Sequence, residues 1–227
     1  MKIKKTRSIQ QIINDQINKW KLIRIEGKKE KPAIPVITIS RQPGSNGHMV
    51  AKKIADELNL DLFDQEIIQA VAESAHMRAS LVETLDEKGV SALEDMIAAV
   101  TKERHLWAYE YLHHLMRVIG TIGKHGHAVI LGRGANFILP REEIFRVRII
   151  APLEVRIENT AKELSISWEE AKQLTIKTES DRKAFIRKYF NADIDDSQNY
   201  DLVINTENLD VNAAVESIKA ALRLRKE

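Results

Sequence analysis

The sequence of 227 residues has no cysteine, only five prolines, and no apolar run that approaches the ~20 residues needed to span a bilayer. The absence of cysteine excludes a disulfide framework, a thiol nucleophile, an iron–sulfur cluster and a cysteine-ligated zinc site. Residues 1–8 also lack the apolar stretch of a secretory signal. We therefore expect a cytoplasmic protein that does not enter a membrane.

The net charge of +2 is distributed unevenly along the chain. Residues 1–31 contain ten Lys and Arg against three Asp and Glu, so that this segment carries +7 and the remainder carries −5. A basic arm of this kind contacts nucleic acid, an acidic partner or its own protein body. Because the excess of positive over negative charge lies in the arm, the sequence does not favour nucleic-acid binding by the main domain.

The arm contains an amphipathic helix over residues 8–25. Apolar residues recur there every three or four positions, at Ile9, Ile13, Ile17, Trp20 and Ile23. One such face needs cover, either from the body of the protein or from a second copy in a homodimer. We divide the chain into an N-terminal helix and basic linker, 1–33, and a main domain, 34–227. We expect the helix to be an accessory, without which the main domain still folds.

Short β-branched segments alternate with helical patterns through the main domain. Strands are predicted near 36–40, 60–63, 128–131, 145–150 and 200–204. Residues 64–125 contain almost no strand pattern and are predicted to form a helical insert. Ser167 and Glu170 match a capping box at the start of a helix that reaches about residue 190. This alternation predicts an α/β fold with a parallel sheet covered on both faces.

The turn after the first predicted strand has the strand–glycine turn–helix order of a phosphate-binding loop. Backbone N–H groups and the start of the helix favour an anion there. The usual pattern is G-x-x-x-x-G-K-[ST]. With its second glycine on Gly47, His48 replaces the lysine and Met49 the hydroxyl residue, so an ordinary turn is the alternative. The phosphate-binding candidates are Gly44, Ser45, Asn46, Gly47 and His48. We add Arg41 as a permanent cation and the Ser45 hydroxyl as a metal ligand.

Further charged residues follow at the ends of later elements. Arg133 lies between two glycines at the carboxyl end of a predicted strand, where open α/β sheets bind ligands. Asp181, Arg182 and Arg187 lie on a charged helix, for which a solvated surface is the alternative interpretation. Two histidine pairs, 113 with 114 and 125 with 127, have no carboxylates at ligand spacing, so neither pair predicts a metal site.

Together these segments resemble the cytidylate kinase-like family of P-loop nucleoside monophosphate kinases. The matching segments run in family order at 39–47, 132–136, 151–157, 181–182 and 200–206. The resemblance implies a P-loop NTPase-like three-layer sandwich with a five-stranded parallel sheet. It implies a monophosphate-binding insert near 64–125 and a short lid around 178–192.

The family transfers the γ-phosphoryl group of ATP to CMP or dCMP with Mg²⁺. By this resemblance Arg133 holds the acceptor phosphate, and Asp181, Arg182 and Arg187 are lid residues that close over the transferring group. The catalytic candidates are therefore Arg41, Arg133, Arg182 and Arg187, with Arg133, Asp181 and Arg182 binding substrate. The altered phosphate loop keeps two alternatives open. One is a phosphotransferase acting on another small acceptor, and the other is a nucleotide-binding regulatory protein without catalysis.

Overall fold

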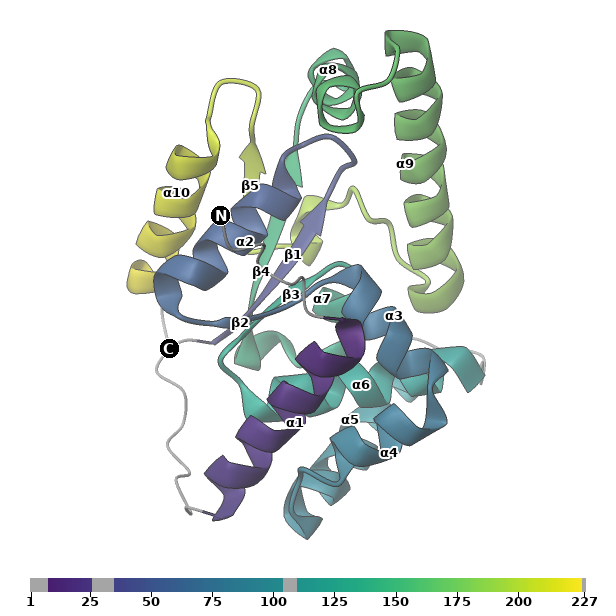
Figure 1. The fold of residues 1–227 in the computed structure, drawn as a ribbon, viewed down its shortest axis with the longest axis vertical. Helices are drawn as coiled ribbons and strands as arrows, with labels where there is room; N and C mark the ends of the chain where they lie inside the picture. The colour runs from purple at the N-terminus through teal and green to yellow at the C-terminus, as the bar shows by residue number, and fades with distance from the viewer. Residues whose placement is uncertain (1–7, 26–34, 104–109, 226–227) are drawn as a thin grey trace, which may run out of the picture.

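The computed structural model describes residues 8–25, 35–103 and 110–225. A five-stranded sheet runs through it in the order β2-β3-β1-β4-β5, and all four strand pairs are parallel (Figure 1). The strands are β1 (Val36–Arg41), β2 (Asp61–Phe63), β3 (Ala128–Leu131), β4 (Ile144–Ile150) and β5 (Leu202–Asn205). The predicted parallel sheet is therefore confirmed, with strand ends that differ by one or two residues.

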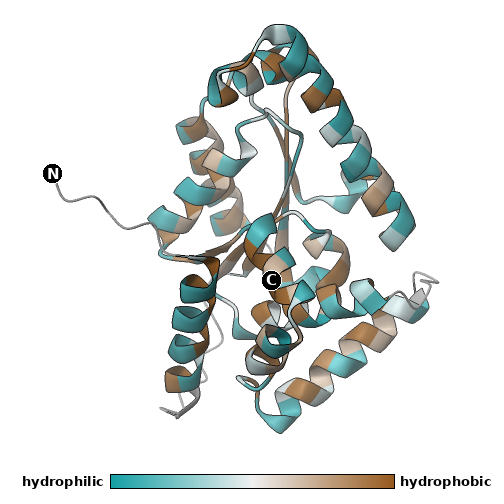
Figure 2. Ribbon diagram, turned by 45° about the vertical axis from the view of Figure 1, so that its right-hand side comes forward, coloured by the Kyte–Doolittle hydropathy of each residue, from teal (hydrophilic) through white to brown (hydrophobic). Residues whose placement is uncertain are grey.

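Side chains of the central strands alternate between two apolar cores on opposite faces of the sheet. Ile37 and Ile39 pack against α2 (Gly47–Leu58) and α10 (Val211–Leu224). Val36 and Ile130 belong to the other core, which the helices of the insert cover. The helices are apolar toward the sheet and polar outside (Figure 2). This arrangement confirms the three-layer sandwich.

The described residues of the insert form four helices: α3 (Gln65–Glu73), α4 (Ala75–Val82), α5 (Glu87–Glu103) and α6 (Glu110–His125). Helix α4 begins at Ala75, because the Ser74 hydroxyl accepts from the N–H of Met77 and caps the helix there. Fully buried Leu93 and Leu115 join α5 and α6 to the core.

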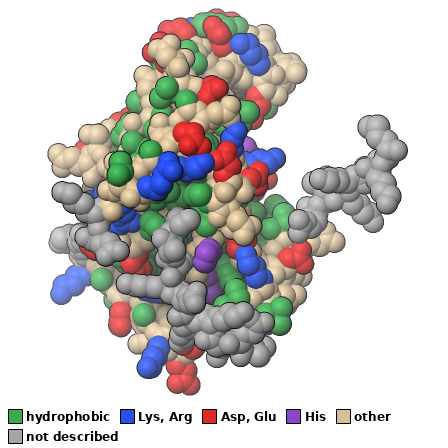
Figure 3. Space-filling model, turned by 90° about the vertical axis from the view of Figure 1, so that its left-hand side faces the viewer, with side chains coloured by type: hydrophobic (Ala, Val, Ile, Leu, Met, Phe, Trp, Pro, Cys, Tyr) green, Lys and Arg blue, Asp and Glu red, His purple; other side chains and the backbone are tan. Residues whose placement is uncertain are grey.

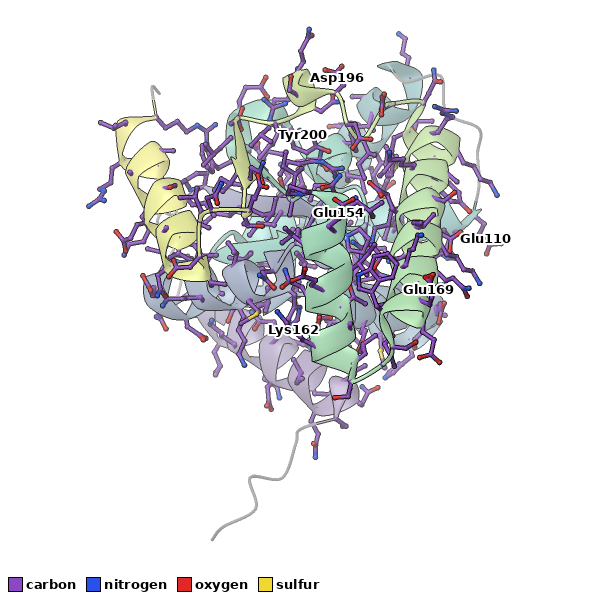
Figure 4. All side chains as sticks on the ribbon, turned by 90° about the horizontal axis from the view of Figure 1, so that it is seen from above. Glu110, Glu154, Lys162, Glu169, Asp196 and Tyr200 are labelled. Carbon is purple, nitrogen blue, oxygen red and sulfur yellow. The ribbon has the colours of Figure 1, made fainter. Side chains whose placement is uncertain are left out.

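After β4, helices α8 (Leu153–Leu164) and α9 (Trp168–Phe190) form a hairpin above the sheet. Figure 4 shows α8, with Glu154 and Lys162 labelled, lying beside α9, whose first turn carries Glu169. The predicted capping box is confirmed: Ser167 and Glu170 exchange hydrogen bonds at the start of α9. The resemblance implied a short lid around 178–192, and most of this segment is the second half of the one long helix α9, which ends at Phe190.

Helix α1 (Ile9–Ile25) packs on the chain's own core. Ile13, Ile17 and Trp20 are buried, and the Trp20 ring stacks on His125 with centroids 4.0 Å apart. Lys19 Nζ lies 2.7 Å from a carboxylate oxygen of Asp61 at the start of β2. The apolar face that we considered for a homodimer is therefore occupied within the chain. The predicted linker at 28–32 lies outside the described residues.

The shorter elements are α7 (Ala135–Ile138) after β3 and two 3₁₀ turns, Arg141–Glu143 and Ser197–Asn199. On the face that includes α2 and α10, acidic and basic side chains are intermingled (Figure 3). Lys219, for example, pairs with Glu57 and Glu216 across and along these helices. None of the helices in the described ranges has the length and apolar character of a membrane span.

Candidate functional site

The loop between β1 and α2 has the backbone of an anion-binding turn. Gly44 and Asn46 are both left-handed, with φ of 74° and 58°, and Ser45 lies between them. The left-handed residues curl the backbone around Ser45, whose N–H donates to the Gln42 carbonyl at 3.3 Å. Asn46 is the N-cap of α2, whose first-turn N–H groups lack acceptors within the helix. The N–H groups at the start of α2 are therefore suited to an anion.

We aligned Gly47 with the second glycine of the phosphate-loop pattern. The structure shows that α2 begins at Gly47 and that the last left-handed residue is Asn46, one position earlier. Asparagine tolerates this conformation better than other residues with a side chain, which is why the sequence alone did not fix the alignment.

Contacts from distant segments hold the loop in this shape. The Gln42 amide accepts from the N–H of Ala151 at 3.0 Å and donates to Glu179 of α9 at 3.1 Å. Asn159 of α8 donates to the Gly44 carbonyl at 2.9 Å. A Cβ added at Gly44 would lie 2.1 Å from the backbone oxygen of Arg156, so both the positive φ and the close approach of α8 require glycine there.

The Ser45 hydroxyl faces away from the open side of the loop. It donates to the carbonyl of Gln42 at 2.8 Å, with Ile149 O at 3.3 Å, and the side chain is fully buried. These bonds stabilise the turn, and they leave no oxygen of this side chain facing the loop interior. The expected metal role of Ser45 therefore has no support in this geometry. His48, by contrast, is exposed at the second position of α2.

Three of the four predicted catalytic arginines meet beside this loop. Arg41 ends β1, Arg133 follows β3, and Arg182 comes from α9, where its guanidinium donates to the Arg41 carbonyl at 3.0 Å. They line one cavity of about 340 Å³ with Asp181. Further lining residues come from the strand ends, α3, α7 and α9, among them Ser40, Gln65, Asn136 and Phe185. Arg187 is exposed on α9 and is not among the lining residues.

Burial and repulsion between like charges lower the pKa of two of these guanidinium groups, those of Arg41 and Arg182. Desolvation, followed by repulsion from Arg182 and Arg133, lowers the pKa of Arg41 to about 9. Desolvation and the charge of Arg148 lower the pKa of Arg182 to about 10. Buried Nε of Arg133 and Nδ2 of Asn136 have no hydrogen-bond partner. Concentrated positive charge with unused donors is the environment that an anion would stabilise.

Other buried arginines of this protein have carboxylate partners. Arg146 pairs with Asp201, Arg148 with Asp195, and Arg156 with Glu179. Within the described ranges no salt bridge is found for Arg41, Arg133 or Arg182. This contrast separates arginines that stabilise the fold from those that are available to a ligand.

Several residues near the cavity escaped the sequence analysis. Gln65 accepts from Arg41 at 3.4 Å, and Arg148 of β4 donates to Ser40 at 2.7 Å while facing the Tyr200 ring at 5.6 Å. The one usable signal was the presence of arginines, Arg146 and Arg148, inside the mostly apolar strand β4. Trp107 and Tyr109 lie outside the described residues. Tyr111 is partly buried and donates to Gln69 at 2.7 Å.

The site offers few ligands for a divalent metal ion. No cluster of three or more acidic or histidine side chains suited to a metal occurs in the described part of the chain. Asp181 is the one carboxylate among the described residues that line the cavity. This donor set fits Mg²⁺, which keeps several waters and uses one or two carboxylates together with substrate phosphates.

Comparisons with known proteins agree with this geometry. The model of the cytidylate kinase-like family matches residues 36–208. Cytidylate kinases of Methanocaldococcus jannaschii and Ignicoccus hospitalis are each 30% identical over 82% of this chain and over 97% and 98% of their own lengths. These kinase names support the phosphotransferase class expected from the sequence.

The fold is shared with a solved structure of an uncharacterized protein from Eubacterium ventriosum. Its TM-score is 0.67 and its identity is 23%, with 84% of this chain and 99% of that chain covered. The family model spans more than half of the chain, from β1 to just beyond β5, and includes the phosphate loop and all three cavity arginines. The chain therefore belongs to the cytidylate kinase-like family.

Proposed function

We propose that this protein transfers the γ-phosphoryl group of ATP to a nucleoside monophosphate, CMP or dCMP. One observation carries the proposal. Arg41, Arg133 and Arg182 come from three different elements to one cavity beside a left-handed phosphate loop, and none of the three forms a salt bridge within the described residues. Phosphoryl transfer depends mainly on positioning and on neutralising the charge of the transferring group, for which fixed guanidinium groups are suited.

In this proposal the loop Gly44–His48 binds the ATP phosphates through backbone N–H groups. Arg133 binds the acceptor phosphate, because its buried Nε has no hydrogen-bond partner and the residue lines the cavity. Its guanidinium carbon lies 5.7 Å from the ring centroid of Phe185, which lines the same cavity. Arg182 lies between the loop and the acceptor and stabilises the transferring group. Arg187 joins the site only if the second half of α9 moves toward the loop.

ATP and Mg²⁺ are the proposed cofactors. When bound, Mg²⁺ would neutralise phosphate charge, and Asp181 is the residue that we propose to hold it, with phosphate oxygens and water as the remaining ligands. We propose the cytoplasm as the place of action, because nucleotide substrates are found there.

The test is a transfer assay with the full chain. ATP or GTP is incubated with CMP, dCMP, UMP, AMP, GMP or small hydroxyl acceptors, and the diphosphate product is quantified. We expect CMP or dCMP to be the preferred acceptor. Transfer to a hydroxyl acceptor alone would establish the other phosphotransferase interpretation. Nucleotide binding without transfer to any acceptor would establish the regulatory one.

Arg133→Gln provides the matched test of the acceptor site. We expect a large rise in the KM for CMP with little change in the ATP dissociation constant, because Arg133 contacts the acceptor side of the cavity. The control Arg223→Gln removes one exposed positive charge from α10, far from the loop in sequence, and should change neither value. Equal losses of ATP and CMP binding with a lowered Tm in Arg133→Gln would indicate a structural role for this arginine.

A further inference from the structure

The structure changes which residue of this protein occupies each position of the phosphate-loop pattern. The usual pattern places its second glycine directly before the helix, followed by lysine and Ser or Thr. Here the left-handed N-cap is Asn46 and α2 begins at Gly47. Counting from Asn46 places Arg41 at the first glycine, Gly47 at the lysine and His48 at the hydroxyl residue. This protein thus has an arginine where the pattern has its first glycine, and a glycine where the pattern has its lysine.

These two positions compete for one space. A Cβ added at Gly47 would lie 2.5 Å from Arg41 Cβ and 3.0 Å from its Cγ. Gly47 is helical and its φ is not positive, so its backbone conformation does not call for glycine. Glycine is disfavoured inside helices. The side chain of Arg41 is therefore what excludes a side chain at position 47.

The far end of Arg41 passes a second glycine on its way to the cavity. A Cβ at Gly132 would lie 2.2 Å from Arg41 Nη1. The guanidinium continues to Gln65 and lines the cavity with Arg133 and Arg182. The two glycines leave a path for one long cationic side chain, at its base and at its tip.

We infer that the phosphate-binding cation has been exchanged between the two sides of the loop. Arg41, at the end of β1, performs the task that a lysine at the start of α2 performs in the usual pattern. Gly47 is the complementary half of the exchange. The inference rests on the proposed function in one respect, since it takes ATP phosphates as the anion that Arg41 meets.

The test compares the full chain with Arg41→Gly, Gly47→Lys, the double variant that carries both changes, and a control double variant, Arg41→Gly with Gly47→Ala. Tm measures how far the side chains at positions 41 and 47 crowd each other. The ATP dissociation constant measures whether a positively charged side chain binds the phosphates. We expect Gly47→Lys to lower Tm by several degrees in the parent and to lower it much less when Arg41 is already glycine.

Arg41→Gly should weaken ATP binding by about tenfold or more, the size of one lost charge-assisted contact. The lysine double variant should recover most of that loss. The alanine double variant should recover Tm without recovering affinity, which separates relieved crowding from restored charge.

Two results from the variants would overturn the inference. One is a Tm loss for Gly47→Lys that is the same in both backgrounds, and the other is an affinity no better in the lysine double variant than in the alanine one. If the parent binds neither ATP nor inorganic tripolyphosphate, the exchanged cation has no ligand and the inference also fails. Tight ATP binding without transfer would reject the proposed function alone, because the affinity arm does not depend on turnover.

Discussion

Replacing Trp20 by alanine tests whether α1 belongs to the core. The side chain is 3% exposed. Its ring stacks on His125 at 4.0 Å with an interplanar angle of 7°, and the Phe63 ring centroid lies 5.9 Å away. These contacts join α1 to α6 and to β2. The sequence had suggested an accessory helix, for which this substitution would have little effect on the main domain.

The expected loss of stability is large. A buried tryptophan removes about 150–250 Å² from water, which corresponds to about 4–6 kcal/mol at ~25 cal/mol/Å². Measured Trp-to-Ala changes in cores cost about 3–5 kcal/mol. For a chain of this length such a loss lowers Tm by on the order of 10 °C.

Urea unfolding of the full chain, followed by circular dichroism, measures this loss. Leu22→Ala is the matched control, because Leu22 is on the same helix and 60% exposed, and we expect a change within about 0.5 kcal/mol. If Trp20→Ala does not fold, the milder Ile17→Val should cost about 0.5–1.5 kcal/mol. A loss below about 1 kcal/mol for Trp20→Ala would refute the packing of α1 on the body.

Three further predictions follow. Desolvation lowers the pKa of His125 from 6.5 to about 4, so the unfolded state binds more protons between these values. The contribution of neutral His125 to the free energy of unfolding is therefore fully present above about pH 6.5, and up to about 3 kcal/mol of it is lost as the pH drops to 4. His125→Phe should show a flatter dependence of this free energy on pH in urea unfolding. Gly44→Ala should lower Tm and abolish ATP binding, and unchanged calorimetric titration would contradict the close approach of α8. The affinity for ATP should be constant over about pH 6–8, because Arg41 stays protonated below its pKa of about 9, and a decline that disappears in His48→Gln would assign the cation to His48.

Local patterns predicted much of this fold. The β-branched runs of β1 and β3 and the apolar run of β4 predicted buried strands, because few other structures bury such short runs. Ser167 and Glu170 predicted the start of α9 for a purely local reason, a reciprocal pair of hydrogen bonds within one turn.

What the sequence concealed depends on contacts between distant residues. The register of the phosphate loop turned on which of Asn46 and Gly47 is left-handed, and both residue types tolerate that conformation. The separation of Arg148 from Arg133 depends on Asp195, a partner 47 residues away that pairs with one and not the other. Only three-dimensional placement distinguishes an arginine that has a carboxylate partner from one that has none among the described residues.

The packing of α1 has a consequence for the order in which the chain is made. Its buried face contacts His125, which a ribosome adds about 100 residues after α1 itself. At ~5–20 residues per second the helix leaves the ribosome at least about five seconds before its docking surface is complete. During that interval Ile13, Ile17 and Trp20 have no native partner from α6. Nascent chains stalled between α1 and α6 should therefore bind a chaperone that recognises apolar helices, and chains stalled beyond α6 should release it.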